Sequence, residues 1–390
     1  MSLDEELDKK VTFIIPLHNR SHYMQFILKY YKEAGFKGKF LFTDDSTLEV
    51  ERERNQALVR EYENDLDLEY FPRPSGQPYP FWKNCDYLLE RTKTKYVQMS
   101  CDDDIFLVPT LRKCIQALNE DDNVYVASGY CYYIDCKDTY TLNPDRIEGN
   151  DLKELGGQVR ECYKKQWQLF DSNLSNDPSE RIIKHFYPYF KESTMNGLQR
   201  TDQVIDKLKT CFDNNLLEGT RTSLFTELYW EGSLHLEGKS IIIDDLFWFR
   251  LHISHKKLNE FKPLHYMGKW SADPKFSEVY YKFADLIEQK ALKQDMDEEK
   301  AWYVGDVIWA STAILRLKRF RFCYAYDIAK RMDIDSPRDF FSRLGRFLMR
   351  ICNRLSGHEE KVKQAKQNKI DQLESKWGSL LQSFIKQIES

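Results

Sequence analysis

Residues 11–20 read VTFIIPLHNR, and they decide the fold more than any other stretch of the chain. The run 11–15 is apolar and rich in β-branched residues, and Pro16 closes it, which is typical of a strand buried in a parallel sheet. Ser21 follows after a short polar loop, and its hydroxyl can cap the free backbone N–H groups of a helix. The stretch therefore predicts a strand, a loop and a helix in direct succession.

The same succession recurs along the first hundred residues. The further strand patterns cover residues 39–43, 66–71 and 96–100, and the helical patterns cover 21–31, 50–62 and 84–91. Alternating strands and helices predict right-handed βαβ units and an α/β fold with a mostly parallel sheet flanked by helices. Ligands bind such sheets outside the carboxyl ends of the strands.

The strand signal weakens further along the chain. We expect a strand over 124–133, loop and short helix over 143–194, and an apolar strand at 241–243 preceded by a helix near 225–230. After about residue 256 helical patterns dominate. We therefore predict a domain over 1–255 and a helical C-terminal region over 256–390.

Composition narrows the class of protein. The 390 residues are 42% hydrophobic and 14% aromatic, so the chain can form a core and is not disordered. The net charge of -4 disfavours a general nucleic-acid binder. Nine cysteines form no CxxC pair, and no apolar run approaches the roughly 20 residues that cross a bilayer. The start, MSLDEELDKK, has no apolar signal core, so we expect a reduced cytoplasmic protein.

The sharpest local motif is the triplet Asp102, Asp103 and Asp104 at the end of the strand 96–100. Adjacent carboxylates repel one another unless a cation is present, and Mg²⁺ or Mn²⁺ prefers oxygen ligands. If the backbone is extended there, Asp102 and Asp104 point to one side and Asp103 to the other. A solvated acidic turn explains the triplet equally well.

Three stretches together resemble a known family. VTFIIPLHNR (11–20), FLFTDDST (40–47) and YVQMSCDDDIF (96–106) resemble, in order and spacing, the motifs of family 2-like glycosyltransferases with the GT-A fold, especially bacterial capsule or lipopolysaccharide sugar transferases. The resemblance covers about the first 105 residues. It implies a GT-A domain with a C-terminal α-helical extension.

The resemblance also implies roles for single residues. Asp44 or Asp45 would accept a hydrogen bond from the base or ribose of a nucleotide-sugar, and Asp104 would be the main metal ligand. The implied nucleotide-sugar ligands are Pro16, His18, Asn19, Arg20, Asp44, Asp45, Arg73, Lys83, Asp102 and Asp103. The implied metal ligands are Asp102, Asp104 and His252. For Lys83, a solvated position at the start of a helix is a slightly better interpretation than the ligand role.

An inverting transfer needs a carboxylate base to deprotonate the acceptor hydroxyl. By position, Glu227 is the first candidate, and Asp245, next to Asp244, is the second. The chain lacks the Glu-Asp pair that many members of the resembling family carry there. His252 and His255 are three residues apart and would share one face if that segment were helical. Structural hydrogen bonding is the simpler interpretation of these histidines and of His235.

The C-terminal third has a different charge. Residues 315–355 hold eleven Lys or Arg against four Asp, and part of this segment predicts a basic amphipathic helix. Such a helix can lie on anionic lipid or pack its apolar face on the protein. The last helical pattern repeats apolar residues at heptad-like spacing, which fits docking on the protein or pairing in a homodimer.

The sequence thus predicts a glycosyltransferase that uses Mn²⁺ or Mg²⁺ and moves a sugar from a nucleotide-sugar, a UDP-sugar first, to a hydroxyl of a glycan or lipid-linked acceptor. Its expected location is the cytoplasm, including the inner face of the cell membrane. A non-catalytic glycan or membrane adaptor is the alternative. A nucleotidyltransferase fits less well, because residues 16–20 supply no glycine for a phosphate loop.

Overall fold

The computed structural model describes residues 2–74, 81–138, 159–186, 194–216, 224–254, 274–302, 304–305, 307–308 and 358–389. The strands in these ranges are β1 (Val11–Leu17), β2 (Lys39–Asp44), β3 (Asp67–Pro72), β4 (Tyr96–Met99), β5 (Asp104–Phe106), β6 (Val124–Asp138), β7 (Val159–Gln168), β8 (Leu198–Arg200) and β9 (Lys239–Ser254). The helices are α1 (Leu3–Asp8), α2 (Ser21–Glu33), α3 (Glu49–Tyr62), α4 (Phe81–Leu89), α5 (Val108–Glu120), α6 (Pro178–Phe186), the 3-10 helix η2 (Thr194–Asn196), α7 (Thr201–Asp213), α8 (Leu224–Glu237), α10 (Pro274–Leu292) and α14 (His358–Glu389).

One sheet runs through the described residues, with strands in the order β3-β2-β1-β4-β8-β6-β9-β5 and β7 added beside β6. The first four strands of that order are parallel, as the sequence predicts. Leu17 lies opposite Asp44, and Ile14 lies opposite Met99, so β1, β2 and β4 end along one edge. That edge carries the loops with His18, Asp45 and Asp102.

The other half of the sheet is mixed. Strand β8 is antiparallel to β4 and β6, β6 is parallel to β9, and β5 is antiparallel to β9. The predicted α/β fold is confirmed, but two local predictions are wrong. The segment 143–194, expected to be loop and short helix, contains β7, and the apolar run 241–243 is only the beginning of the 16-residue β9. Strand β7 reads VRECYKKQWQ, a polar composition that suits a strand paired only with β6 in the described part of the sheet.

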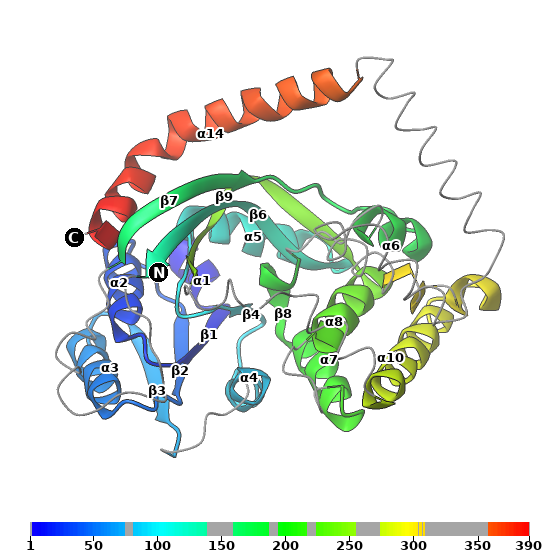
Figure 1. The fold of residues 1–390 in the computed structure, drawn as a ribbon, viewed down its shortest axis with the longest axis horizontal. Helices are drawn as coiled ribbons and strands as arrows, with labels where there is room; N and C mark the ends of the chain where they lie inside the picture. The colour runs from blue at the N-terminus through cyan, green and yellow to red at the C-terminus, as the bar shows by residue number, and fades with distance from the viewer. Residues whose placement is uncertain are drawn as a thin grey trace.

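Side chains alternate between the two faces of the sheet. Phe13 and Phe40 point into the main core, which α2 and α5 cover, whereas Ile14 and Leu41 point into a second core beneath α4, α7 and α8. A third cluster joins α6, α8 and α10. Figure 1 shows α2 and α3 at one end of the molecule and α7, α8 and α10 at the other.

Helices α10 and α14 confirm the predicted C-terminal α-helical extension. Helix α14 lies along β7 and β9 (Figure 1), and its Leu373 and Leu381, each 3% exposed, belong to the main core. Docking on the protein therefore accounts for the positions of Leu373 and Leu381 in the heptad-like pattern of α14. The basic segment 315–355 lies outside the described residues. None of the described helices is long and apolar enough to cross a membrane.

Candidate active site

A cleft of about 410 Å³ opens at the carboxyl ends of β1, β2 and β4. It is the position at which parallel α/β sheets bind ligands. The residues that line it come from these strand ends, α4 and β9: Pro16, Leu17, His18, Arg20, Asp45, Phe81, Asn84, Cys101, Asp102, Asp103 and Arg250. The structure thus brings together six of the predicted binding residues: Pro16, His18, Arg20, Asp45, Asp102 and Asp103.

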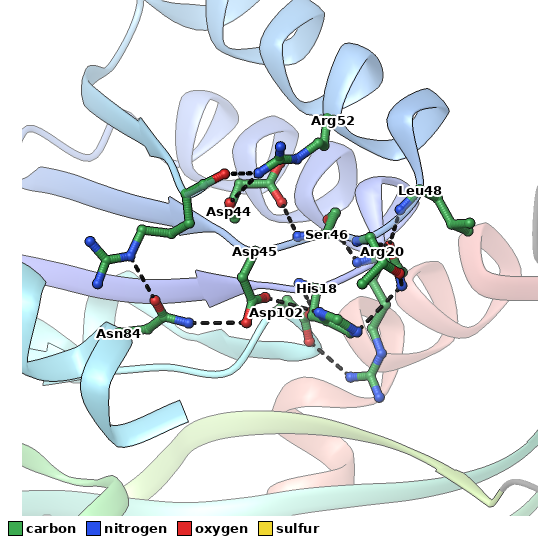
Figure 2. A network of polar contacts seen from close by, with 12 residues as sticks. His18, Arg20, Asp44, Asp45, Ser46, Leu48, Arg52, Asn84 and Asp102 are labelled. Carbon is green, nitrogen blue, oxygen red and sulfur yellow. Dashed lines mark hydrogen bonds and ion pairs between the residues drawn. The ribbon is translucent and has the colours of Figure 1, made fainter. Parts of the chain in front are cut away.

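Asn19 shapes the cleft without lining it. Its φ of 54° lies in the left-handed region, which Asn tolerates better than most residues. The Asn19 side-chain oxygen accepts hydrogen bonds from the backbone N–H groups of Thr47 (2.9 Å) and Leu48 (3.1 Å), and the backbone N–H of Asn19 donates to Ser46 Oγ (2.8 Å). The loop after β1 is thereby fixed to the loop after β2 (Figure 2).

The two aspartates at the end of β2 have different surroundings. Asp44 is fully buried, and its carboxylate accepts hydrogen bonds from the backbone N–H of Ser46 (2.8 Å), the amide of Asn55 (2.8 Å) and the hydroxyl of Tyr70 (2.5 Å). These donors occupy both oxygens of Asp44. Of the pair, Asp45 is the residue that lines the cleft.

Asp45 begins a row of polar side chains across the cleft (Figure 2). One Asp45 oxygen lies 2.9 Å from His18 Nδ1, and the other accepts from Asn84 Nδ2 (3.2 Å). The contact with Asp45 raises the pKa of His18. Asn84 Oδ1 in turn accepts from Arg73 Nε (3.2 Å), so Arg73 reaches the cleft through Asn84. Lys83, one position earlier on α4, is exposed and does not line the cleft.

Asp102 and Asp103 form a turn, and Asp104 is the first residue of strand β5. The Asp104 backbone N–H donates to the carbonyl of Cys101 (3.3 Å). Asp102 and Asp103 both accept from Arg20, at 2.9 and 3.3 Å, whereas Asp104 Oδ1 lies 3.8 Å from Arg250 Nε. The alternation predicted for an extended backbone does not apply here, because residues 102 and 103 form a turn.

The three carboxylates of this segment contact two arginines, Arg20 and Arg250, so the positive charge beside them is smaller than their own negative charge. Burial raises the pKa of Asp104 to about 7 and that of Asp102 to about 6, although Arg250 and Arg20 oppose the rise. Asp104 Oδ1 is buried and accepts no hydrogen bond from the described residues. A buried carboxylate oxygen that accepts no hydrogen bond and has only a long ion pair is stabilised by a proton or by a closer cation.

A divalent cation fits this turn. Ligand atoms of Cys101, Asp103 and Asp104 all lie within 4.8 Å of one another. Carboxylate oxygens suit Mg²⁺ and Mn²⁺. Asp102, predicted as a metal ligand, lies beside this group, but its two oxygens already contact Arg20 and, at 3.5 Å, the backbone N–H of His18.

A second cluster of potential metal ligands, His185, Glu231 and His235, is fully buried between α6 and α8. Asn173 Nδ2 lies 2.8 Å from the Arg181 carbonyl, which can only accept, so this atom is the amide nitrogen and also donates to His235 Nδ1 at 3.2 Å. The ring proton of His235 is then on Nε2, which leaves that nitrogen no lone pair for a cation. We interpret the cluster as a hydrogen-bonded network, and His235 as a structural histidine.

The two predicted bases, Glu227 and Asp245, are not among the residues that line the cleft. Glu227 is half-buried on α8 and is not among the residues that line the cleft. The Asp245 carboxylate accepts from Lys113 (2.8 Å), Lys376 (2.6 Å) and Trp377 (2.7 Å), and these donors lower its pKa. Asp245 therefore connects β9 to α5 and α14.

His252 lies on β9, opposite Asp135 of β6. The prediction that His252 and His255 share one helical face is wrong, because His252 is in a strand. His255 lies outside the described residues. The His252 side chain is also outside the described part of the chain.

Besides the six predicted residues, the cleft is lined by Leu17, Phe81, Asn84, Cys101 and Arg250. Cys101 had a signal, since it directly precedes the triple aspartate. Arg250 had none, because it reaches the cleft only through the pairing of β9 with β5, in which it lies opposite Asp104.

No protein-family model matches the chain, and no curated protein matches it in sequence. Among solved structures, it is similar to TarS of S. aureus in complex with UDP-GlcNAc, at 15% identity over 80% of this chain and 73% of that chain, with a TM-score of 0.45. It is also similar to the mannosyltransferase PcManGT from Pyrobaculum calidifontis in complex with GDP-Man and Mn²⁺, at 11% identity over 87% and 85% of the two chains, with a TM-score of 0.39. A third similar structure is 4-diphosphocytidyl-2C-methyl-D-erythritol synthase from Anaerococcus prevotii, at 8% identity over 60% and 89%, with a TM-score of 0.33. Likenesses this distant assign no activity, so we argue function from the residues of the cleft.

Proposed function

We propose that the chain is a glycosyltransferase that moves a sugar from a nucleotide-sugar to a hydroxyl acceptor with the help of a divalent cation. The observation that carries the proposal is the turn at Asp102–Asp104, where the buried Oδ1 of Asp104 accepts no hydrogen bond from the described residues and has only the long ion pair to Arg250, at 3.8 Å. This turn shares one cleft with the row of His18, Asp45 and Asn84. A cation site beside a row of hydrogen-bonding groups suits a nucleoside diphosphate.

The two ends of the cleft suit the two ends of the donor. Asp45 and Asn84 offer an acceptor and an amide to a base or ribose, and we take the donor to be a UDP-sugar. Arg20 and Arg250 supply guanidinium groups that match the geometry of phosphate oxygens. A bound Mn²⁺ or Mg²⁺ at Asp103 and Asp104 would neutralise the charge of the leaving diphosphate.

Transfer with inversion at the anomeric carbon needs a base near the acceptor hydroxyl. Glu227 stays our candidate, since three donors already hold the Asp245 carboxylate. We take the acceptor to be a glycan or a lipid-linked glycan, with residues 1–255 as the catalytic region. Membrane contact through 315–355, the extra ligand His252 and a homodimer stay predictions.

A thermal-shift panel tests the proposal. The full chain is heated with UDP-, GDP-, CMP- and dTDP-sugars, with and without Mn²⁺, because a ligand that binds the folded state raises the melting temperature. We expect one nucleotide-sugar to stabilise the chain only with the cation, and to release its nucleoside diphosphate on incubation. Asp104→Asn should lose the effect, whereas Asp122→Asn, which removes an exposed carboxylate, should keep it.

Other outcomes separate the alternatives. Stabilisation by a nucleotide-sugar without any turnover favours a non-catalytic adaptor. Turnover of a nucleoside triphosphate with release of pyrophosphate favours a nucleotidyltransferase. If no nucleotide-sugar stabilises the chain, the proposal fails.

A further inference from the structure

We infer that Cys101 is a ligand of the cation in the cleft and that its sulfur shifts the preference of the site from Mg²⁺ toward thiophilic cations such as Zn²⁺ and Cd²⁺. The inference rests on the cation site of the proposed function, but it does not depend on glycosyl transfer. It adds a residue that selects the metal.

The geometry of the turn carries the inference. Cys101 is half-buried and lines the cleft, and its sulfur lies within 4.8 Å of carboxylate oxygens of Asp103 and Asp104. Asp104 is 2% exposed, and its Oδ1 accepts no hydrogen bond from the described residues. Two bonds of 2.0 to 2.6 Å to a shared cation span a similar distance.

Asp102 is a poorer third ligand than Cys101. One Asp102 oxygen accepts from Arg20 at 2.9 Å, and the other contacts the backbone N–H of His18 at 3.5 Å. A cation bound to Asp102 would have to compete with these donors. The hydrogen bond of this turn uses the backbone carbonyl of Cys101 and not its sulfur.

Sulfur changes which metals bind well. Thiolate is a soft ligand that favours Zn²⁺ and the heavier Cd²⁺, whereas carboxylate and water favour Mg²⁺. As the metal–sulfur bond forms, the thiol gives its proton to the solvent. A site with two carboxylates and one thiolate therefore gains more affinity for Cd²⁺ or Zn²⁺ than for Mg²⁺.

Cys101 differs in exposure from the other thiols that the structure describes. Cys85, Cys114, Cys131 and Cys211 are free and buried in the described part of the chain, and Cys101 is more exposed than any of them. Cys114→Ala is a matched control, since it removes a thiol of α5 that does not line the cleft.

The test uses the full chain, reduced and stripped of metal, without any donor. Titration with CdCl₂ is followed by the ultraviolet charge-transfer absorption of a cadmium–thiolate bond, and the affinities for MgCl₂ and CdCl₂ are measured by calorimetry. We expect the wild type and Cys114→Ala to show the band. Cys101→Ser should lose it and should lose at least about tenfold in affinity for Cd²⁺, with much less change for Mg²⁺.

Alkylation provides a second readout that needs no variant. In the wild type, Cd²⁺ should protect Cys101 from N-ethylmaleimide, as read by mass spectrometry of the peptide that contains it, while Mg²⁺ should protect it much less. This readout decides the question if Cys101→Ser does not fold.

The outcomes separate this inference from the proposed function. A cadmium–thiolate band that survives in folded Cys101→Ser, or a wild type that binds Mn²⁺ while Cd²⁺ leaves Cys101 unprotected, overturns the inference. The proposed transferase is unaffected by that result. If Cys101 binds Cd²⁺ but no nucleotide-sugar is ever turned over, the proposed function fails and the inference stands.

Discussion

Asp104 is buried in a turn that holds two other carboxylates, and burial raises its pKa from 3.8 to about 7. The folded chain therefore binds this proton more tightly than the unfolded chain does. Between about pH 4 and pH 7 the folded state holds more protons, so the free energy of unfolding of the cation-free chain increases as the pH falls. The raised pKa of His18, with its unfolded value at 6.5, acts in the same direction.

We predict this pH dependence in urea unfolding measured with a chelator at pH 8, 7 and 6. Each fully shifted carboxyl group contributes at most about 1.4 kcal/mol per pH unit. Asp104→Asn should flatten the profile, because asparagine does not titrate. Parallel profiles for the variant and the wild type would show that Asp104 keeps its ordinary pKa.

Asp44 and Asp45 are adjacent but should respond differently to the same substitution. Asp44→Asn replaces a fully buried acceptor of hydrogen bonds from Ser46, Asn55 and Tyr70, and we expect a loss of about 1–3 kcal/mol in stability. Asp45→Asn should cost less stability but weaken nucleotide-sugar binding about tenfold, a loss of about 1.4 kcal/mol. Urea unfolding and calorimetric titration measure the two effects. Equal losses in both assays for both variants would refute the division of roles.

The residues of the cleft were predictable to the extent that they follow strands directly in sequence. His18, Asp45 and Asp102 come after β1, β2 and β4, and parallel strands bring their carboxyl ends to one edge. Arg250 was not predictable in this way, since it depends on the register of β9 against the three-residue strand β5. The different surroundings of Asp44 and Asp45 were not predictable either, because the donors to Asp44, Tyr70 and Asn55, come from elsewhere in the fold.

Among the helices and strands, those with strong apolar patterns were predictable and the short or polar ones were not. Strands β1, β2 and β4 are buried throughout or nearly so. Strands β5 and β8 have three residues each, too few to show a period, and β7 is polar. Their place in the sheet is fixed by pairing with β9 and β6, which a local pattern does not contain.

A few side chains hold helix α14 to the sheet. In the central turns of α14, Leu373 is the residue with the smallest exposed fraction, 3%. We predict that Leu373→Ala weakens the docking of α14 by about 2–5 kcal/mol, because a buried leucine loses both apolar contact and filled volume. Hydrogen exchange of residues 364–383 should then become faster, while exchange in β1 and β2 stays slow.

Gln372→Ala is the control, since Gln372 is exposed on the neighbouring position of the same helix. If both substitutions leave exchange in α14 unchanged, Leu373 does not hold the helix. If both accelerate it equally, the faster exchange does not come from the lost contact of the buried Leu373 side chain, because alanine does not lower helix propensity.

Residues on the two sides of the predicted boundary at residue 255 share hydrophobic clusters. Phe225 and Leu228 of α8 pack with Phe283 and Ile287 of α10, and the ring centroids of Phe225 and Phe283 are 5.4 Å apart. Leu373 of α14, a helix that contacts β7 and β9, belongs to the main core. Every one of these contacts crosses residue 255.

We therefore predict that residues 1–255 do not fold alone, although they carry every residue that lines the cleft. Removing 256–390 would expose the face of α8 that packs on α10, and buried apolar surface contributes about 25 cal/mol per Å². Calorimetry should show one cooperative transition for the full chain, and circular dichroism should show the fragment without one. Addition of separately expressed 256–390 should restore the transition in part, because the contacts are non-covalent. A fragment that melts like the full chain and binds a nucleotide-sugar would instead make 1–255 an independent domain, and would leave α14 as an attachment without a structural role.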